Sequence, residues 1–354
     1  MKILITGGAG FVGSNLAIKL KQKYPAYSFV IFDNLKRRGS ELNLLDFKKL
    51  GIEFVHGDIR NPEDLEQLGA FDCMIEASAE PSVMSGLDGS PNYVINNNLV
   101  GSINCFNVCI KNKASLVFLS TSRVYPISLI ENANYTEEAT RFSFTDNQSI
   151  AGISSKGVSE ALSLDAARSF YGTTKLAAEY LIKEYVEFYG LKAAVTRFGV
   201  IAGPRQMGKT DQGVVTLWMA RHYWQKGLSY IGYGGMGKQV RDMLHIDDLI
   251  RLVDMQIHNM DKFDGKVYNA GGGLAGSASL LEMTQICSEI TGNTIDIASV
   301  KENRPADLRI YISDNTRIEQ EIGWKPEKTA KDIFTDIYHW IKDNEAELKP
   351  LLMG

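Results

Sequence analysis

The stretch that decides the fold is "ITGGAGFVGSNLAIKL", residues 5–20. It places Gly7, Gly10 and Gly13 in a G-x-x-G-x-x-G pattern between a strand-like run and a helix-like run. Glycines are needed where a turn requires unusual backbone angles and where the chain must come close to a phosphate. The helix N-terminus that follows offers unpaired N–H groups to anions. The pattern therefore predicts a strand, loop and helix that bind the pyrophosphate of a dinucleotide.

Short β-rich runs alternate with helix-like runs through the first half of the chain. The runs "KILIT", "SFVIFD", "CMIEAS" and "SLVFLST" are strand-like, and each is followed by a helical or polar segment. Such alternation is typical of a doubly wound parallel sheet with helices on both faces. We expect an α/β protein with a Rossmann-type dinucleotide-binding domain over residues 1–190, which receives a later contribution from 238–262. A smaller C-terminal α/β substrate domain is expected over 191–354.

Composition narrows the class of protein. The chain has 354 residues, 44% hydrophobic and 23% charged, which is enough for a large core. Its net charge of −4 and its scattered cations argue against a nucleic-acid partner. No apolar run reaches the roughly 18 residues of a membrane span, and the start lacks a signal-peptide pattern, so we expect a cytoplasmic protein without a membrane partner.

The cysteines do not predict a metal site. Cys73, Cys105, Cys109 and Cys287 lack the spacing of metal ligands and have apolar neighbours. We expect reduced thiols that are buried or half-buried. Cys105 and Cys109 are four residues apart on a predicted helix, where packing is the expected role.

A carboxylate at the end of the second predicted strand indicates which dinucleotide binds. Asp33 follows Gly13 by twenty residues and can accept hydrogen bonds from both ribose hydroxyls of adenosine, which favours NAD over NADP. Residues 36–38 are basic and could accommodate a 2′-phosphate, although a solvated loop is the preferred interpretation. Asp58 and Ile59 follow the third strand and are expected beside the adenine. The remaining predicted cofactor contacts are Phe11, Val12 and Asn34.

The segment "YGTTK", residues 171–175, precedes a helix-like run. On a helix, Tyr171 and Lys175 project from one face at i and i+4. The ammonium can then lower the pKa of the phenol, which is about 10 in water. This spacing alone occurs in many helices, so it needs support from other motifs.

Together with the glycine loop and "FLSTSRVY", residues 118–125, this pair resembles the catalytic set of the extended short-chain dehydrogenase/reductase family. The resemblance implies that Tyr171 is the acid/base and that Lys175 binds the nicotinamide ribose and keeps Tyr171 acidic. It also implies that Thr121 hydrogen-bonds the substrate hydroxyl, with Ser122 as the alternative. Pro126 stands where the family's Val-Tyr-Gly element has glycine.

Two further segments, residues 76–83 and 97–104, resemble family motifs that surround the dinucleotide. Glu76 and Glu80 depart from the usual residue types there, and whether they approach a ligand is open. The contacts implied by the resemblance are Ala77, Ala79 and Asn98 for the cofactor, and Ser82 for the substrate.

The second half resembles the family's substrate-binding segments. Arg241 in "VRDMLHIDDLI" and Arg304 in "ENRPADLRIYISD" match positions where nucleotide-sugar epimerases hold the substrate diphosphate, and guanidinium suits bidentate phosphate contact. A surface ion pair is the alternative for each arginine. Arg205 and Gln206, which follow the strand "TRFGVIAG", are further expected substrate contacts. His245 in this motif is expected to have a structural role.

The residues after Thr121 separate reaction types within the family. Nucleotide-sugar 4,6-dehydratases carry an Asp-Glu pair there, because dehydration needs an acid and a base. The chain has Ser122 and Arg123, which leaves epimerisation, simple oxidation or reduction, or oxidative decarboxylation. The segments "RQMGKTDQGVV" and "GYGGMGKQVRDMLHIDDLI", and above all residues 211–213 and 237–242, are similar to epimerases that act at C2 of CDP-linked sugars.

The resemblance therefore implies an isomerase that binds NAD tightly and acts on a nucleotide-diphospho sugar, with a CDP-sugar favoured. It also implies a homodimer or higher homo-oligomer, built on the helix of Tyr171 and on residues 93–112. A UDP-sugar 4-epimerase or a nucleotide-sugar reductase is the alternative. A cofactor sensor without turnover is less favoured, because Thr121, Tyr171 and Lys175 are all present. Residues 145–170 form either a substrate-covering loop or a solvated surface loop.

Overall fold

The computed structural model describes residues 1–87, 89–208 and 213–353. The chain divides into two compact units. The first unit comprises Met1–Thr121, Ser169–Arg197 and Leu249–Val267, and the second comprises Ser122–Arg168, Phe198–Asp248 and Tyr268–Gly354. Within the described residues, no helix combines the length and the apolar character needed to cross a membrane.

The first unit contains most of a seven-stranded sheet with the order β14-β10-β5-β4-β1-β2-β3, although only Val267 of β14 is assigned to this unit. Strand β1 pairs in parallel with β2 on one side and with β4 on the other, and the pairs β2–β3 and β4–β5 are also parallel. The strands are β1 (Lys2–Thr6), β2 (Ser28–Asp33), β3 (Glu53–His56), β4 (Cys73–Glu76), β5 (Ser115–Thr121), β10 (Ala193–Phe198) and β14 (Val267–Ala270).

This order confirms the expected Rossmann-type sheet. The chain runs outward from β1 to β3 and then returns to the other side of β1 with β4. The reversal places the carboxyl ends of β1 and β4, at Thr6 and Glu76, next to each other. In open α/β sheets a crevice for ligands forms at this switch point.

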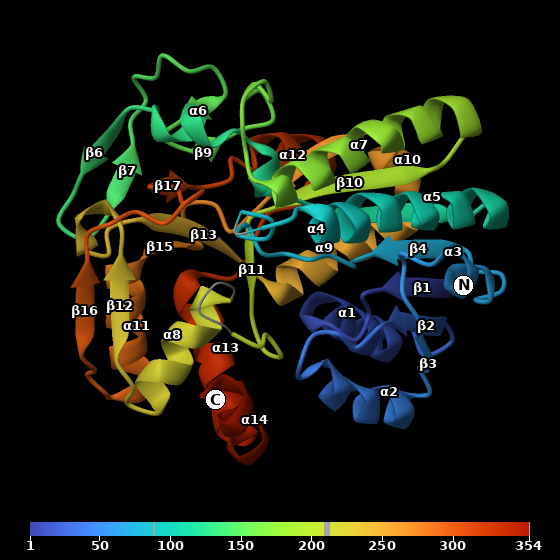
Figure 1. Ribbon diagram of the computed structural model, residues 1–354, viewed down its shortest axis with the longest axis horizontal. Helices are drawn as coiled ribbons and strands as arrows, with labels where there is room; N and C mark the ends of the chain where they lie inside the picture. The colour runs from blue at the N-terminus through green and yellow to red at the C-terminus, as the bar shows by residue number, and fades with distance from the viewer. Residues whose placement is uncertain (88, 209–212, 354) are drawn as a thin grey trace. The chain divides into compact units, whose positions relative to one another are not determined.

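The helices of the first unit follow the strands in the expected alternation, and α5 and α7 run side by side (Figure 1). A π-helical turn at Asn96–Val100 joins α4 to α5. The helices are α1 (Phe11–Lys23), α2 (Leu44–Leu50), α3 (Pro62–Glu66), α4 (Asn92–Ile95), α5 (Gly101–Asn112), α7 (Phe170–Tyr189), α9 (Ile246–His258) and α10 (Met260–Phe263), with a 3-10 turn at Ser40–Asn43.

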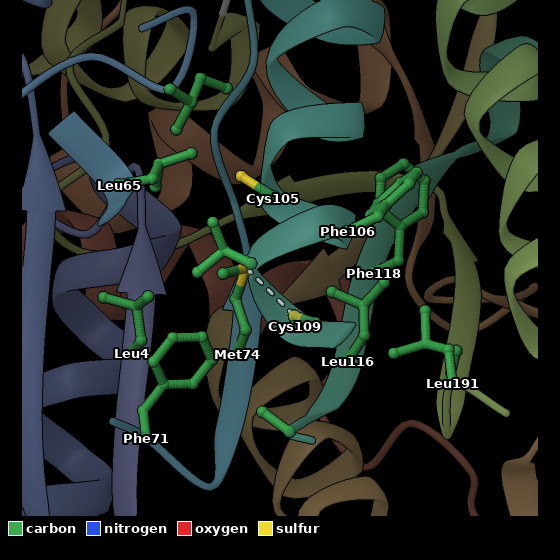
Figure 2. Close-up of a cluster of buried hydrophobic side chains, with 14 of the residues drawn as sticks. Leu4, Leu65, Phe71, Met74, Cys105, Phe106, Cys109, Leu116, Phe118 and Leu191 are labelled. Carbon is green, nitrogen blue, oxygen red and sulfur yellow. Dashed lines mark hydrogen bonds between the residues drawn. The ribbon is translucent and has the colours of Figure 1, made fainter. Parts of the chain in front are cut away.

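The sheet is buried on both faces, as a parallel sheet requires. Leu4, Met74 and Leu116 point into a cluster with side chains of α5 and α7 (Figure 2). The alternate residues Ile3 and Ile75 are fully buried as well. The resulting strands read as near-continuous apolar runs, which is why they were recognisable in the sequence.

The four cysteines are free and buried, as expected. Cys105 and Cys109 lie in the cluster of Figure 2, where the Cys109 Sγ is 3.7 Å from the Met74 Sδ. Burial raises the pKa of both thiols well above the ordinary value. Their role in this unit is packing.

The second unit combines small sheets with helices. Strand β13 pairs with β11, β15 and β17, and β12 pairs with β16. Its strands are β6 (Tyr135–Glu137), β7 (Phe142–Phe144), β8 (Ile153–Ser154), β9 (Gly157–Val158), β11 (Val200–Ala202), β12 (Leu228–Ile231), β13 (Val240–His245), β15 (Ser277–Ser279), β16 (Ile297–Val300) and β17 (Ile310–Tyr311). Its helices are α6 (Ile127–Glu131), α8 (Val214–Tyr223), α11 (Leu280–Thr291), α12 (Thr316–Ile322), α13 (Ala330–Asp343) and α14 (Glu345–Leu352), with 3-10 turns at Ser122–Val124 and Tyr233–Gly235.

The two units differ from the boundaries expected from the sequence. Residues 122–168 belong to the second unit, which makes it the longer of the two rather than the smaller. The segment that returns to the first unit is 249–267 instead of 238–262. The physical reason is that 122–168 contains one short α-helix, a 3-10 turn and four strands of two or three residues, which pack with later segments of the second unit.

A buried ion pair fixes helix α7 against the sheet. The Glu179 carboxylate accepts two hydrogen bonds from the Arg197 Nε at 3.1 Å and one from its Nη2 at 2.7 Å. It also accepts a hydrogen bond of 2.5 Å from the Ser120 hydroxyl. Because Ser120 lies on β5 and Arg197 on β10, one carboxylate ties the helix to two strands.

We predict that Glu179→Ala lowers the free energy of unfolding by about 3–5 kcal/mol, because it leaves the Arg197 guanidinium buried without a counter-ion. Urea denaturation followed by circular dichroism measures this change. The control is Glu184→Ala, which removes an exposed glutamate from the same helix and should change stability by less than about 0.5 kcal/mol. Similar values for the two variants would show that the pair does not anchor α7.

Candidate functional site

The loop between β1 and α1 has the backbone geometry of a phosphate cradle. Gly7 has φ +63°, and a Cβ added there would lie 2.8 Å from the carbonyl carbon of Ala77. A Cβ on Gly13 would lie 2.5 Å from the carbonyl oxygen of Gly7. Side chains at these positions would fill the loop, so only glycine leaves the backbone and the N-terminus of α1 open to an anion. The predicted residues Gly10, Phe11 and Val12 complete the junction, with Gly10 as the N-cap of α1.

Asp33 lies at the end of β2 and is tied to the glycine loop. Its Oδ2 accepts a hydrogen bond from the Ala9 N–H at 3.0 Å, and its Oδ1 accepts one from the Leu35 N–H at 2.8 Å. Burial raises the pKa of Asp33, while these backbone donors oppose the rise. A carboxylate has about four acceptor positions, so capacity remains for two ribose hydroxyls. The geometry fits the predicted contact with NAD.

Asn34 and Asp58 form a polar pair after β2 and β3. The Asn34 amide donates to the Asp58 carboxylate at 2.9 Å. The Arg60 guanidinium donates to both carboxylate oxygens, at 2.9 and 2.6 Å, and holds the pKa of Asp58 well below its usual range. The side chain of Ile59 is buried in the core cluster, so only its backbone could contact the adenine, and this contact stays a prediction.

The loop after β4 is held next to the glycine loop by its own backbone. Ala77 donates to the Thr6 carbonyl at 3.1 Å. The buried Asn98 amide binds Glu80 in both directions, accepting from the Glu80 N–H at 2.7 Å and donating to the Glu80 carbonyl at 3.0 Å. Asn98 thus positions the loop that carries Ala79, and a direct contact between Asn98 and the cofactor stays a prediction.

Side chains of the same loop are also engaged. The Ser82 hydroxyl is buried and accepts from the Met84 N–H at 3.3 Å. The Glu80 Oε1 accepts from the Ser82 N–H at 3.2 Å. The predicted contact between Ser82 and a substrate therefore concerns a hydroxyl that already serves the loop as an acceptor.

The predicted catalytic residues Thr121, Tyr171 and Lys175 belong to the same compact unit. Thr121 is the last residue of β5 and is buried. Tyr171 is the second residue of α7, whose N-cap Ser169 accepts from the Gly172 N–H at 3.2 Å. The helix packs against β5. Thus "YGTTK" is not a segment before the helix but its first turn, and Ser122 begins the 3-10 turn that follows β5.

Lys175 points into the protein and pairs with an acid that the sequence left unassigned. Its Nζ lies 3.4 Å from the Glu76 Oε2 and 3.9 Å from the centre of the Phe118 ring. Both charged side chains are buried, with 2% of Lys175 and none of Glu76 exposed. The glutamate at the switch point therefore touches the predicted catalytic set.

The motif around Arg241 is largely satisfied within the second unit. Arg241 donates to the Asp307 carboxylate and to the Leu308 carbonyl, both at 2.5 Å. The His245 Nδ1 accepts from the Asp247 N–H at 3.0 Å, in agreement with the expected structural role. The Asp248 carboxylate accepts from the backbone N–H groups of residues 327 and 328. Arg241 is thus in a largely buried ion pair, whereas the alternative considered for it was a surface ion pair. Its contact with phosphate stays a prediction.

The other predicted substrate residues also lie in the second unit. The Gln206 side chain donates to the Ile201 carbonyl at 2.9 Å and accepts from the Thr216 hydroxyl at 3.0 Å, so it braces the loop before α8. Arg205 has φ +74°, a backbone conformation that favours glycine. Arg304 is exposed. Residues 211 and 212, which carried much of the resemblance to the 2-epimerases, lie outside the described residues.

The segment 145–170 is anchored in the second unit by β9. Val158 is fully buried, donates to the Ile312 carbonyl at 2.7 Å and accepts from the Asp314 N–H at 2.9 Å. The Glu160 carboxylate accepts from the Asn269 N–H at 2.6 Å. These contacts show that the segment is not wholly a solvated loop. Covering of a substrate stays a prediction.

The sequence interpretation missed two buried acids, Glu76 and Glu179, as partners of buried cations. Glu179 follows Lys175 by four residues, so the helical spacing already placed it on the face of Tyr171 and Lys175. Glu76 follows an apolar run at the end of a predicted central strand, which is an unusual place for a carboxylate. Both signals were present, but the cations that they bind could not be identified from spacing.

Comparison with known proteins shows to which family this chain belongs. The chain matches the NAD dependent epimerase/dehydratase family over residues 3–271. It is 32% identical over 349 residues to CDP-paratose 2-epimerase of Salmonella typhi, covering 96% of this chain and 99% of the relative. It is 26% identical over 358 residues to dTDP-glucose 4,6-dehydratase of Mycolicibacterium smegmatis, covering 99% and 96%.

A solved structure has the same fold. The UDP-glucuronic acid 4-epimerase of Bacillus cereus, in complex with UDP-glucuronic acid and NAD, superposes with a TM-score of 0.76 at 24% identity and covers 97% of this chain and 99% of its own. The matched length includes the glycine loop, Thr121, Tyr171 and Lys175. The chain therefore belongs to the NAD dependent epimerase/dehydratase family, which confirms the Rossmann-type fold and the NAD-dependent enzyme class expected from its sequence.

Proposed function

We propose that the protein is an NAD-dependent epimerase of a nucleotide-diphospho sugar, and that it interconverts CDP-paratose and CDP-tyvelose at C2. The observation that carries the proposal is the position of Tyr171 on the first turn of a capped helix, with Lys175 on the same face and the glycine cradle in the same unit. The relative at 32% identity, named as a CDP-paratose 2-epimerase, supports the choice of sugar and carbon.

Three residues of the chain carry the proton transfer and the hydrogen bonds to the sugar: Thr121, Tyr171 and Lys175. NAD, when bound at the glycine cradle, supplies an acceptor that takes a hydride from the sugar carbon and returns it. Tyr171 removes the proton of the sugar hydroxyl at its phenol oxygen and later gives it back. Thr121 hydrogen-bonds that hydroxyl and then the carbonyl that replaces it. The Lys175 ammonium stabilises the phenolate, since a phenol without such help titrates at about 10.

An epimerase must return the keto-sugar without eliminating water, so its site should lack the acid and base pair of a dehydratase. The residues after Thr121 are Ser122 and Arg123, and the Arg123 guanidinium donates to the Ala306 carbonyl at 3.3 Å. Neither side chain supplies the acid and base that water elimination needs. A UDP-sugar 4-epimerase and a nucleotide-sugar reductase use the same residues, so the substrate and the fate of the hydride decide among the three.

A product assay by NMR tests the substrate. The purified protein is incubated, without added oxidant, with CDP-paratose, CDP-tyvelose and a panel of UDP-hexoses. We expect interconversion of the two CDP-sugars and release of NAD on denaturation. A cofactor-loaded protein that leaves every sugar unchanged would contradict an epimerase. Deuterium transfer from labelled cofactor into the product would indicate a reductase.

We predict that Tyr171→Phe lowers kcat by about 100-fold or more, because it removes the acid/base and little volume. NAD binding, measured by calorimetry, should remain. Tyr180→Phe is the matched control, since Tyr180 lies on the same helix and is exposed. Near-normal turnover of Tyr171→Phe would show that another group moves the proton.

We predict that Arg304→Ala raises KM for the nucleotide sugar about tenfold or more and leaves kcat within about twofold, because a charged hydrogen bond to phosphate contributes about 1.5–3 kcal/mol to binding. Lys301→Ala is the control, since it removes the same charge from an exposed position three residues away. Arg304→Lys should recover only part of the affinity, because an ammonium lacks the bidentate geometry. Equal KM values for the two alanine variants would show that Arg304 does not bind the substrate diphosphate.

A cytoplasmic homodimer completes the proposal. Apolar side chains are exposed on α7, with Phe188 at 73% and Tyr189 at 66%, and Val100 at the end of the π-helical turn is 41% exposed. These positions support the expected association through α7 and residues 93–112. Light scattering in solution distinguishes a dimer from a monomer.

A further inference from the structure

The carboxylate of Glu76 occupies a costly position at the switch point of the sheet. Its Oε2 is 3.4 Å from the Lys175 Nζ, and its Oε1 is buried without a hydrogen-bond partner among the described residues. A buried acceptor without a partner costs about 1–3 kcal/mol, and more when it is charged. Burial raises the pKa of Glu76, and both the Lys175 ammonium and the backbone N–H of Ser78 oppose the rise.

The surroundings leave Lys175 dependent on this carboxylate. The Nζ also faces the Phe118 ring from β5, which attracts the ammonium but offers it no hydrogen-bond acceptor with a full negative charge. The thiols of Cys105 and Cys109 on α5 stay neutral, because burial raises their pKa. On α7 itself, Tyr171 lies one turn before Lys175, and Glu179 one turn after it is occupied by Arg197. In the described part of the chain, Glu76 is therefore the only carboxylate in contact with the ammonium.

Stability does not account for this pair. A buried ion pair is often no more stable than apolar residues of the same volume, since the desolvation of two charges offsets their attraction. Here the contact is a single one at 3.4 Å, whereas Arg197 and Glu179 form several short bonds. A weak, incompletely satisfied pair beside predicted catalytic residues points to a role in ionisation.

We propose that Glu76 is a positioning residue whose carboxylate keeps the Lys175 ammonium protonated and fixed within the catalytic unit. The proposal deepens the proposed function and rests on it, because the ammonium matters through Tyr171. Without Glu76, an ammonium that is 2% exposed would have no contacting carboxylate in the described part of the chain to stabilise its charge. Tyr171 would then lack the cation that supports its phenolate.

The test measures the ionisation of Lys175 directly. Lysine labelled with ¹³C at Cε is followed by NMR through a pH titration, and the Lys175 signal is assigned with Lys175→Arg. In Glu76→Gln we expect the Lys175 signal to titrate at a lower pH than in wild type, because the buried ammonium loses its carboxylate partner. Glu80→Gln is the matched control, because it removes an acid four residues away that accepts from the Ser82 N–H. The control should titrate like wild type.

Three outcomes would overturn the inference. One is the same Lys175 titration in Glu76→Gln and in wild type, even if the variant is less stable. A second is an equal shift of the Lys175 titration in Glu80→Gln, which would show that any nearby negative charge has the effect and that contact with Glu76 is not needed. If Glu76→Gln does not fold, wild type and Glu76→Asp decide: Lys175 must be protonated at neutral pH in both, and a neutral Lys175 in wild type contradicts the proposal.

A kinetic readout connects this pair to the reaction. Activity that needs the ammonium is lost as the pH rises through the pKa of Lys175, so kcat of Glu76→Gln should fall at a lower pH than kcat of wild type. KM for the nucleotide sugar should change little. The NMR titration needs no substrate, so it separates the two hypotheses. If the Lys175 titration shifts as expected but the protein has no epimerase activity, the inference about the ion pair stands and the proposed function is wrong.

Discussion

Two buried cations and two buried acids govern the placement of helix α7. Lys175 and Glu179 are one helical turn apart, and each must meet an opposite charge inside the protein because isolated buried charges are very costly. Glu179 meets Arg197 and Ser120, and Lys175 meets Glu76. A helix held at two successive turns cannot slide or rotate relative to the strands. Tyr171 lies one turn earlier on the same face, so these contacts also fix its position.

The pairing of Lys175 with Glu76 also connects helix α7 to the predicted ligand site at the carboxyl ends of the strands. Glu76 ends β4 beside Thr6 of β1, and the glycine loop begins immediately after Thr6. The contact between Lys175 and Glu76 therefore links α7 to the switch point where the dinucleotide is expected. Thr121 ends β5, the next strand along the sheet. The glycine loop and the predicted catalytic residues thus lie on one framework of parallel strands.

Local patterns predicted the framework, and contacts distant in sequence determined the rest. The glycine loop and the strands β1 to β5 were recognisable because turn chemistry and apolar runs are local signals. The partner of Lys175 is 99 residues away, which no helical or strand periodicity encodes. The segment 122–168 was misplaced because strands such as Gly157–Val158 are too short for a pattern, and their pairing partners come much later.

A polar residue that matches a family motif need not contact a ligand. In the segment from Arg241 to Asp248, polar groups that match the family motif bind other parts of the second unit: Arg241 binds Asp307, and Asp248 binds the backbone at residues 327 and 328. Such groups must be satisfied for the second unit to fold, whatever the substrate. By contrast, the Glu76 Oε1 is buried and unsatisfied. Within the segment from Arg241 to Asp248, the Asp242 Oδ1 is also buried without a hydrogen-bond partner among the described residues, so an unsatisfied atom does not by itself indicate function. The Glu76 carboxylate is informative because it also contacts Lys175, a predicted catalytic residue.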